Sequence, residues 1–194
     1  MKYVIIMGSP RKNGNTNAIL QPFMDELRKG GAELDLFWVY DMEVHGCMAC
    51  RICQQDWDHY SCRFDDGVRP VYESILSSDA FVLATPIYGW YCTGPMKCLL
   101  DRLIYCSCMY YGEEKGPALF KGKKMYILTT CGYKPEKGAY VFEEGMKMYC
   151  RHCAIEYGSM HAERDMGYKA AFMDEEKEER ARAFARSILA SDVC

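Results

Sequence analysis

The sequence contains no long hydrophobic run, because its apolar stretches fall far short of the roughly 18 residues of a membrane span. It also lacks an excess of positive charge. The formal net charge of −3 at pH 7 argues against a surface that binds nucleic acids or anionic membranes. The apolar stretch at residues 3–7 is too short for a secretory signal and runs into a polar loop. We therefore expect a cytoplasmic protein that binds neither nucleic acid nor membrane.

Cysteine is the residue type in excess, with 12 among 194 residues. This content is still below that of secreted disulfide scaffolds, which are also much shorter. In a reducing compartment we expect thiols or metal ligands rather than bridges. Four cysteines cluster in a segment without a regular period, residues 40–65: Cys47, Cys50, Cys53 and Cys62.

Short apolar runs alternate with helical patterns five times along the chain. The strands are expected at residues 3–7, 34–39, 80–84, 125–128 and 154–160, and the helices at about 15–29, 66–77, 95–106, 139–150 and 174–190. This alternation predicts an α/β fold whose parallel sheet is covered on both faces. We expect one domain over residues 1–194 with a cysteine-rich insertion at 40–65. A ligand is expected beyond the carboxyl ends of the strands.

The loop at residues 8–16 joins the first strand to the first helix and carries hydroxyl, arginine and amide side chains. Backbone N–H groups at the start of a helix bind phosphate. The glycine spacing, with Asn15 where a lysine is required, excludes a nucleotide P-loop. We therefore predict a phosphate-monoester site formed by Ser9, Arg11, Asn15, Thr16 and Asn17. The alternative is a plain turn in which Thr16 caps the helix.

Four segments together carry a family resemblance: the loop at 8–16, the cysteine segment followed by Asp65-Asp66, the segment 85–90, and the helix start Gly94-Pro95-Met96-Lys97 with Asp101-Arg102. In this order they resemble the NADPH-dependent FMN reductase family, and the cysteine segment is similar to that of its iron–sulfur flavoprotein branch. The resemblance implies a flavodoxin-like three-layer sandwich whose five parallel strands follow the order 2-1-3-4-5. It also implies FMN as the cofactor.

A flavin ring needs backbone donors at its polar edge and an apolar or aromatic wall on its face. The resemblance places the ring on a second loop, formed by Pro86, Ile87, Tyr88, Gly89 and Trp90. Residues 129–133 supply a third loop at the same sheet edge, from which we predict contacts by Thr130, Cys131 and Gly132. Proline and glycine within the aromatic run favour a shaped loop. The alternative is a set of aromatic side chains that only cap the core. Since the flavin performs the electron chemistry, we predict no catalytic residue.

The clustered cysteines allow several interpretations. Cys47, Cys50, Cys53 and Cys62 can hold a [4Fe–4S] cluster. They can also bind structural zinc, remain free thiols or form a redox disulfide. Because the segment follows the second strand on the carboxyl side of the sheet, we expect it to overhang the flavin.

The resemblance implies an FMN-dependent oxidoreductase that moves electrons from NAD(P)H or ferredoxin to a flavin, quinone or similar acceptor. One alternative is an electron carrier that holds a flavin and an iron–sulfur cluster but turns over no small molecule. Another is a zinc-stabilised interaction domain. The aromatic residues at 85–111 are of a kind enriched at interfaces, so we expect a homodimer or homotetramer.

Overall fold

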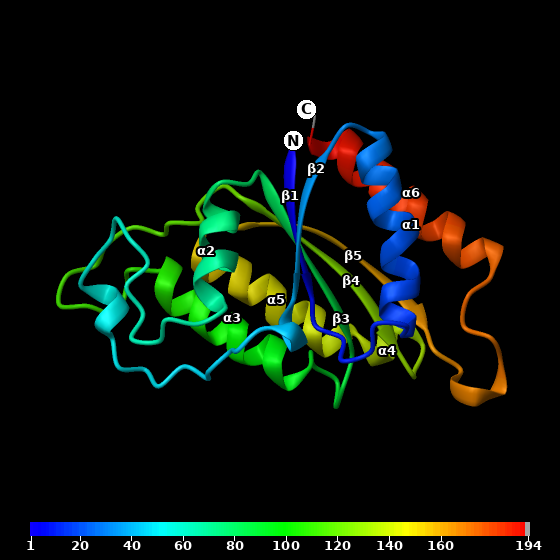
Figure 1. The fold of residues 1–194 in the computed structure, drawn as a ribbon, viewed down its shortest axis with the longest axis horizontal. Helices are drawn as coiled ribbons and strands as arrows, with labels where there is room; N and C mark the ends of the chain where they lie inside the picture. Colours follow the sequence, from blue (N-terminus) through cyan, green and yellow to red (C-terminus); the bar gives the residue numbers. More distant parts are fainter. Residues whose placement is uncertain (193–194) are drawn as a thin grey trace.

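The computed structural model describes residues 1–192, and a parallel sheet of five strands forms its centre (Figure 1). The strands are β1 (Lys2–Met7), β2 (Glu33–Trp38), β3 (Ala80–Pro86), β4 (Lys124–Cys131) and β5 (Glu156–Arg164). All neighbouring strands are parallel, and their spatial order is β2-β1-β3-β4-β5. This is the flavodoxin-like order, so the predicted fold class is confirmed.

Helices cover both faces of the sheet and complete the three layers. On one face lie α1 (Asn15–Lys29) and α6 (Glu175–Asp192), which pack against each other. On the other face lie α2 (Val68–Leu76), α3 (Gly94–Ser107) and α5 (Tyr140–Cys153) (Figure 1). The short helix α4 (Pro135–Gly138) precedes α5. Within residues 1–192, no helix combines the length and apolar character needed to cross a membrane.

Strand β1 shows how the apolar runs produce two cores. Tyr3, Ile5 and Met7 join the core beneath α1 and α6, whereas Val4 and Ile6 join the core on the opposite face. Successive side chains of a strand point to opposite faces of a sheet, and all five of these residues are 0% exposed. A continuous apolar run is therefore what a strand covered on both faces requires.

Three strands continue past the carboxyl ends that the sequence pattern predicts, and one of them is β3, which runs to Pro86 instead of ending at residue 84. β5 continues past residue 160 to Arg164, and β4 continues through the buried residues Thr129, Thr130 and Cys131. Thr129 Oγ1 donates to Thr85 O at 2.5 Å. A buried hydroxyl is tolerated when it is hydrogen-bonded, so hydropathy alone ends β4 too early.

Candidate functional site

The loops at the carboxyl ends of β1, β3 and β4 are tied to one another by hydrogen bonds. Thr93 Oγ1 donates to Gly8 O at 2.7 Å, which joins the loop after β3 to the loop after β1. The hydroxyl oxygens of Thr16 and Thr130 lie 2.7 Å apart and join the start of α1 to the end of β4. Ile87 N donates to Thr130 O at 2.8 Å and so joins the loop after β3 to the end of β4. The three loops therefore form one connected site at this edge of the sheet.

The first loop leaves the N-terminus of α1 open to an anion. Gly14 is the N-cap residue and no side chain caps the helix, so the cap that we considered for Thr16 is wrong. The N–H groups of a first helical turn have no intrahelical acceptor, and α1 carries no acidic residue there. Ser9 and Arg11 lie beside this end, since Arg11 N donates to Ser9 Oγ at 3.2 Å and the Arg11 side chain lies next to Gly14. Arg11 is exposed and is available to a phosphate.

The other predicted phosphate ligands have different surroundings. Asn17 Nδ2 donates to Lys12 O at 2.7 Å, so the Asn17 amide closes the loop instead of facing a ligand. Asn15 lies at the first position of α1 and is partly exposed. Thr16 and Thr130 share one hydrogen bond, which uses the hydrogen of only one hydroxyl and leaves the other hydrogen for a ligand.

Sequence reasoning missed Trp38, whose side chain contacts the first loop. Trp38 Nε1 donates to Ser9 O at 2.6 Å, and Lys12 Nζ lies 3.7 Å from the centroid of the Trp38 ring while it pairs with Asp41. Trp38 is the last residue of β2 and matches the strand pattern, so no local signal shows that its indole reaches the neighbouring loop.

The second loop is a tight turn between Tyr88 and Tyr91. Tyr88 N donates to Tyr91 O at 2.8 Å, and Tyr91 N donates to Tyr88 O at 3.1 Å. The two central residues, Gly89 and Trp90, have φ values of 56° and 64°. Positive φ at both positions defines a type I′ turn, which is uncommon for a bulky residue such as tryptophan. This conformation leaves the Trp90 side chain 50% exposed.

A cavity of about 240 Å³ lies between the second and third loops and is lined by Ile87, Gly89, Trp90, Cys131, Gly132, Tyr133 and Gly138. Its aromatic wall is a stacked pair, because the ring centroids of Trp90 and Tyr133 lie 5.8 Å apart with an interplanar angle of 15°. A partly aromatic cavity suits one face of a planar ring. Burial raises the pKa of the Cys131 thiol, which therefore stays neutral beside this cavity at pH 7.

Five of the eight residues predicted for the ring line this cavity: Ile87, Gly89, Trp90, Cys131 and Gly132. Pro86 and Thr130 are instead buried at the ends of their strands, and Tyr88 is 50% exposed outside the cavity. Tyr133 and Gly138 were not among the predicted contacts. Tyr133 belongs to the third loop, so its position in the sequence was a signal, whereas Gly138 comes from the unexpected helix α4.

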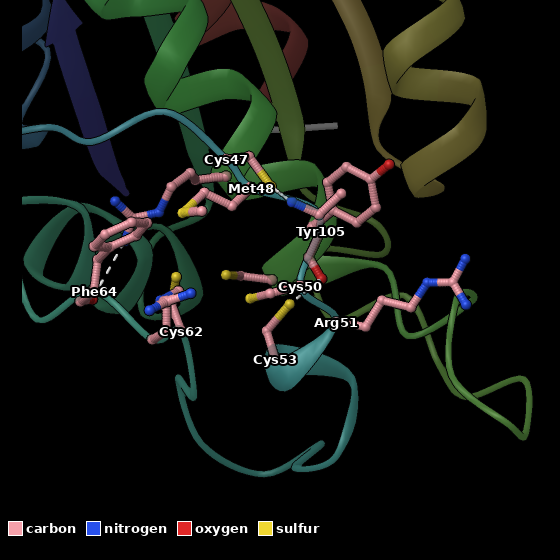
Figure 2. A pocket seen from close by; sticks show the side chains of 12 residues that line it. Cys47, Met48, Cys50, Arg51, Cys53, Cys62, Phe64 and Tyr105 are labelled. Atoms are coloured by element: carbon pink, nitrogen blue, oxygen red, sulfur yellow. Dashed lines mark hydrogen bonds between the residues drawn. The ribbon is translucent and has the colours of Figure 1, made fainter.

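A second cavity lies against the cysteine segment, and all four clustered cysteines line it: Cys47, Cys50, Cys53 and Cys62 (Figure 2). A fifth cysteine, Cys106 from α3, lines the same cavity together with Arg102 and Tyr105. Sequence reasoning missed Cys106, although a second group of cysteines at residues 92–108 was a signal.

The cysteines of this cavity differ in their pKa values. A hydrogen bond between the Cys53 and Cys106 thiols lowers the pKa of Cys53 and raises that of Cys106. Burial raises the pKa of Cys47. Cys53 is therefore the thiol of this pair that loses its proton first, as a metal ligand must.

Gln54 fixes the cysteine segment against the C-terminal end of α3. Its Nε2 donates to Tyr105 O at 2.5 Å and to Cys108 O at 3.2 Å, and its Oε1 accepts from Tyr111 N at 3.0 Å. The carbonyls at the end of a helix have no intrahelical donor, so the buried amide satisfies them.

This anchoring places the cysteine cavity against the second half of α3, and our expectation that the segment overhangs the flavin stays a prediction. The cysteine cavity begins at Arg102, eight residues beyond Gly94, which corresponds to about 12 Å along α3. The cavity with Trp90 and Tyr133 lies beyond the other end of that helix, and the two cavities share no lining residue. In Figure 1 the cyan cysteine segment accordingly lies to one side, beside α2 and α3.

The arrangement of the thiols distinguishes between the metal groups considered. Among residues 1–192, no three His, Cys, Asp or Glu side chains converge on a point where they could hold a single ion. A structural zinc site requires four ligand atoms at about 2.0–2.3 Å from one ion. The four thiols that line the cavity are the ligand set that a [4Fe–4S] cluster takes, so the residues present fit that group by their chemistry.

Comparison with known proteins connects this geometry to a family. The chain matches the family model described as NADPH-dependent FMN reductase over residues 1–143. It is similar to the iron-sulfur flavoprotein of Methanosarcina thermophila, with 32% identity over 104 residues, 54% of this chain and 53% of that protein. The chain spans about half the length of the first curated relatives that it matches.

Two solved structures share the fold across nearly the whole chain. The NAD(P)H:quinone oxidoreductase from Methanothermobacter marburgensis has a TM-score of 0.73 and 18% identity, over 97% of this chain and 95% of that one. The FMN-dependent NADH-azoreductase from Bacillus anthracis str. Ames Ancestor has a TM-score of 0.68 and 14% identity, over 98% of each chain. Since the matched residues 1–143 include all three interlinked loops and the cysteine segment, the chain belongs to the NADPH-dependent FMN reductase family.

Proposed function

We propose that this protein is an FMN-dependent oxidoreductase that takes electrons from NAD(P)H or reduced ferredoxin and passes them to a flavin, quinone or similar acceptor. The observation that carries the proposal is the connected set of three loops, in which Thr16 contacts Thr130 and Thr93 contacts Gly8. An open helix N-terminus at one end of this site and an aromatic-walled cavity at the other suit the phosphate and the ring of one FMN molecule.

The protein's own residues bind and orient the cofactor in this proposal. Arg11, Ser9 and the first-turn N–H groups of α1 hold the phosphate, while Trp90 and Tyr133 cover one face of the ring. When bound, FMN supplies the electron transfer chemistry, and the protein tunes it through contacts and burial. No side-chain acid or base is needed, so we assign no catalytic residue.

We further propose that Cys47, Cys50, Cys53 and Cys62 hold a [4Fe–4S] cluster. The four thiols line one cavity, and the hydrogen bond with Cys106 lowers the pKa of Cys53. The name of the Methanosarcina thermophila relative supports this assignment. The two separate cavities also keep open a second function, that of an electron carrier between flavin and cluster without small-molecule turnover.

Anaerobic purification followed by spectroscopy and a kinetic assay tests the proposal. We expect flavin absorption bands, a broad iron–sulfur shoulder, and oxidation of NADPH or NADH when a quinone or free flavin is added. The protein could instead contain flavin and iron, fail to oxidise NAD(P)H and be reduced rapidly by ferredoxin. This result would identify ferredoxin as the electron donor, or the protein as an electron carrier without small-molecule turnover. A colourless protein with stoichiometric zinc would overturn the proposal in favour of a zinc-stabilised interaction domain.

A further inference from the structure

Arg102 is a buried wall of the cysteine cavity. It lies in α3, its side chain is 1% exposed, and it lines the cavity together with the four clustered cysteines. Arg51 and Arg63 also line the cavity but are exposed on its rim. Among the described residues that line this cavity, none is an aspartate or glutamate. The cavity therefore combines thiols with positive charge.

Four of the five N–H groups of the Arg102 guanidinium have acceptors. Nη1 donates to Asp66 Oδ2 at 2.5 Å and to His45 O at 3.3 Å, and Nη2 donates to Tyr60 Oη at 2.6 Å and to Phe64 O at 3.3 Å. These contacts hold the guanidinium in one orientation, because each terminal nitrogen is fixed by two acceptors from different parts of residues 45–66.

The fifth N–H group of Arg102 has no acceptor. Arg102 Nε is buried and finds no hydrogen-bond partner within residues 1–192. A buried donor without an acceptor is destabilising, and such groups in native proteins usually have a partner that the polypeptide does not supply. An anionic group held by the cysteines of this cavity would supply that partner.

We propose that Arg102 donates its Nε–H group to the iron–sulfur cluster held by the cysteines, and that the Arg102–Asp66 ion pair sets the reduction potential of that cluster. This inference rests on the cluster assignment in the proposed function. A [4Fe–4S] cluster with four thiolate ligands is an anion, and its reduction adds one further negative charge. A buried cation and a hydrogen-bond donor stabilise the more negative state, so Arg102 raises the reduction potential.

Asp66 opposes Arg102 in this arrangement. Its side chain is 2% exposed and forms an ion pair with the guanidinium, so it cancels part of the positive charge at the cavity wall. Loss of the Arg102 charge should therefore lower the reduction potential of the cluster, whereas loss of the Asp66 charge should raise it. A role of Arg102 in packing alone does not produce this opposition, because damage to the fold would move both variants the same way.

The test is a reductive titration of the anaerobically purified holoprotein with dithionite, which supplies one electron per cluster, followed by electron paramagnetic resonance. We expect Arg102→Gln to lower the midpoint potential so that the ratio of reduced to oxidised cluster falls at least about tenfold at a fixed potential, a shift of 59 mV for one electron. We expect Asp66→Asn to raise the midpoint. The flavin midpoint should stay unchanged in both variants, since its cavity shares no residue with this one.

Arg69→Gln is the matched control. Arg69 carries the same charge and pairs with Asp65, but its side chain is 42% exposed and it does not line the cavity, so its loss should leave the cluster midpoint unchanged. Equal midpoints in wild type and Arg102→Gln would overturn the inference, as would shifts of Arg102→Gln and Asp66→Asn in the same direction. If Arg102→Gln does not fold, Asp66→Asn alone tests the inference. A raised cluster midpoint in Asp66→Asn would then support the inference, and an unchanged midpoint would overturn it.

Iron and sulfide analysis of the wild-type protein distinguishes failure of the cluster assignment from failure of the role proposed for Arg102. Wild-type protein without iron overturns the cluster assignment and the inference together, and this result is known before any titration. Wild-type protein with iron but with an unchanged Arg102→Gln midpoint overturns the inference alone.

Discussion

The hydroxyl oxygens of Thr16 and Thr130 lie 2.7 Å apart, although 114 positions separate the two residues in the sequence. This contact joins the start of the first helix to the end of the fourth strand. It fixes the position of the proposed phosphate site relative to the proposed ring site, and so it defines the length of ligand that the edge of the sheet can accept. The predictions below test the two ends of that site separately.

Removal of the Arg11 side chain should weaken FMN binding without affecting riboflavin. Arg11 is exposed and lies beside the open end of α1, so Arg11→Ala should remove a charge-assisted hydrogen bond of about 1.5–3 kcal/mol and weaken FMN binding about tenfold or more. Flavin fluorescence titration measures both affinities. Lys12→Ala is the control, because Lys12 already pairs with Asp41 and should change the affinity by no more than about twofold. Equal loss of FMN and riboflavin binding would contradict the phosphate assignment.

Removal of the Trp90 side chain should have the complementary effect. Trp90 and Tyr133 form the stacked wall of the cavity between the second and third loops, so Trp90→Ala should weaken FMN and riboflavin binding equally, by about two- to tenfold. Tyr133→Phe keeps the ring and should bind both flavins as the wild type does. The same titration serves as the measurement. A loss confined to FMN would show that Trp90 acts on the phosphate end.

Loss of one clustered cysteine should remove the iron and leave the flavin. Cys50 is an exposed residue of the segment that lines the cysteine cavity, so Cys50→Ala should abolish the roughly four iron atoms per chain that a cubane supplies, while FMN remains bound at its separate site. Cys98→Ala is the control, because Cys98 does not line that cavity. Iron analysis and flavin absorbance on the same sample decide the result. Iron retained by Cys50→Ala would show that other residues are the ligands.

Acid should destabilise the protein partly through Asp66. Burial alone would raise the pKa of Asp66, but hydrogen bonds from Arg102, His45 N and Val68 N outweigh it and lower the pKa to about 2, against 3.8 for a free side chain. Because the folded-state pKa is the lower one, this stabilisation, on the order of 2 kcal/mol, is complete above about pH 5 and is lost as the pH falls toward 2.

Denaturant unfolding between pH 7 and pH 2.5 tests this linkage. Asp66→Asn should be less stable than the wild type at pH 7, and the difference should shrink as the pH falls. A constant difference over this range would mean that the charge of Asp66 contributes nothing to folding.

The protein should associate in solution. Large apolar side chains near the cavity between the second and third loops and on α5 are 49–63% exposed: Tyr88, Trp90, Tyr133, Tyr140, Val141 and Met148. Exposed aromatic residues in such numbers are typical of interfaces, so we expect a dimer or tetramer. Light scattering at micromolar concentration should give at least twice the 22.4 kDa of one chain. A 22 kDa species with flavin bound would contradict this expectation.

The sequence predicted the sheet and the first loop well because both depend on local patterns. The apolar run at residues 3–7 is a buried strand, and the polar loop that follows meets a helix start, as the pattern indicated. The anchoring of the cysteine segment to α3 was not predicted because it depends on one long-range contact. Gln54 binds the carbonyl of Tyr105, and nothing in the spacing of the cysteines reveals that partner.

Residues at the end of β4 illustrate a second limit. Thr129 and Thr130 look like loop residues by hydropathy, yet they are buried strand residues whose hydroxyls are satisfied by Thr85 and Thr16. Cys106 and Gly138 were missed for a related reason, since helix periodicity and loop composition do not indicate which cavity a residue lines.

The hydrogen bonds between the three loops have a thermodynamic consequence for the cofactor. Because Thr93, Thr130 and Ile87 already fix the loops in the polypeptide alone, the backbone entropy lost in ordering them belongs to folding rather than to ligand binding. FMN would therefore enter and leave a site whose main chain stays in place. Amide hydrogen exchange at the carboxyl edge should be nearly as slow without the flavin as with it, and the apoprotein would serve as a receptor ready to exchange its cofactor.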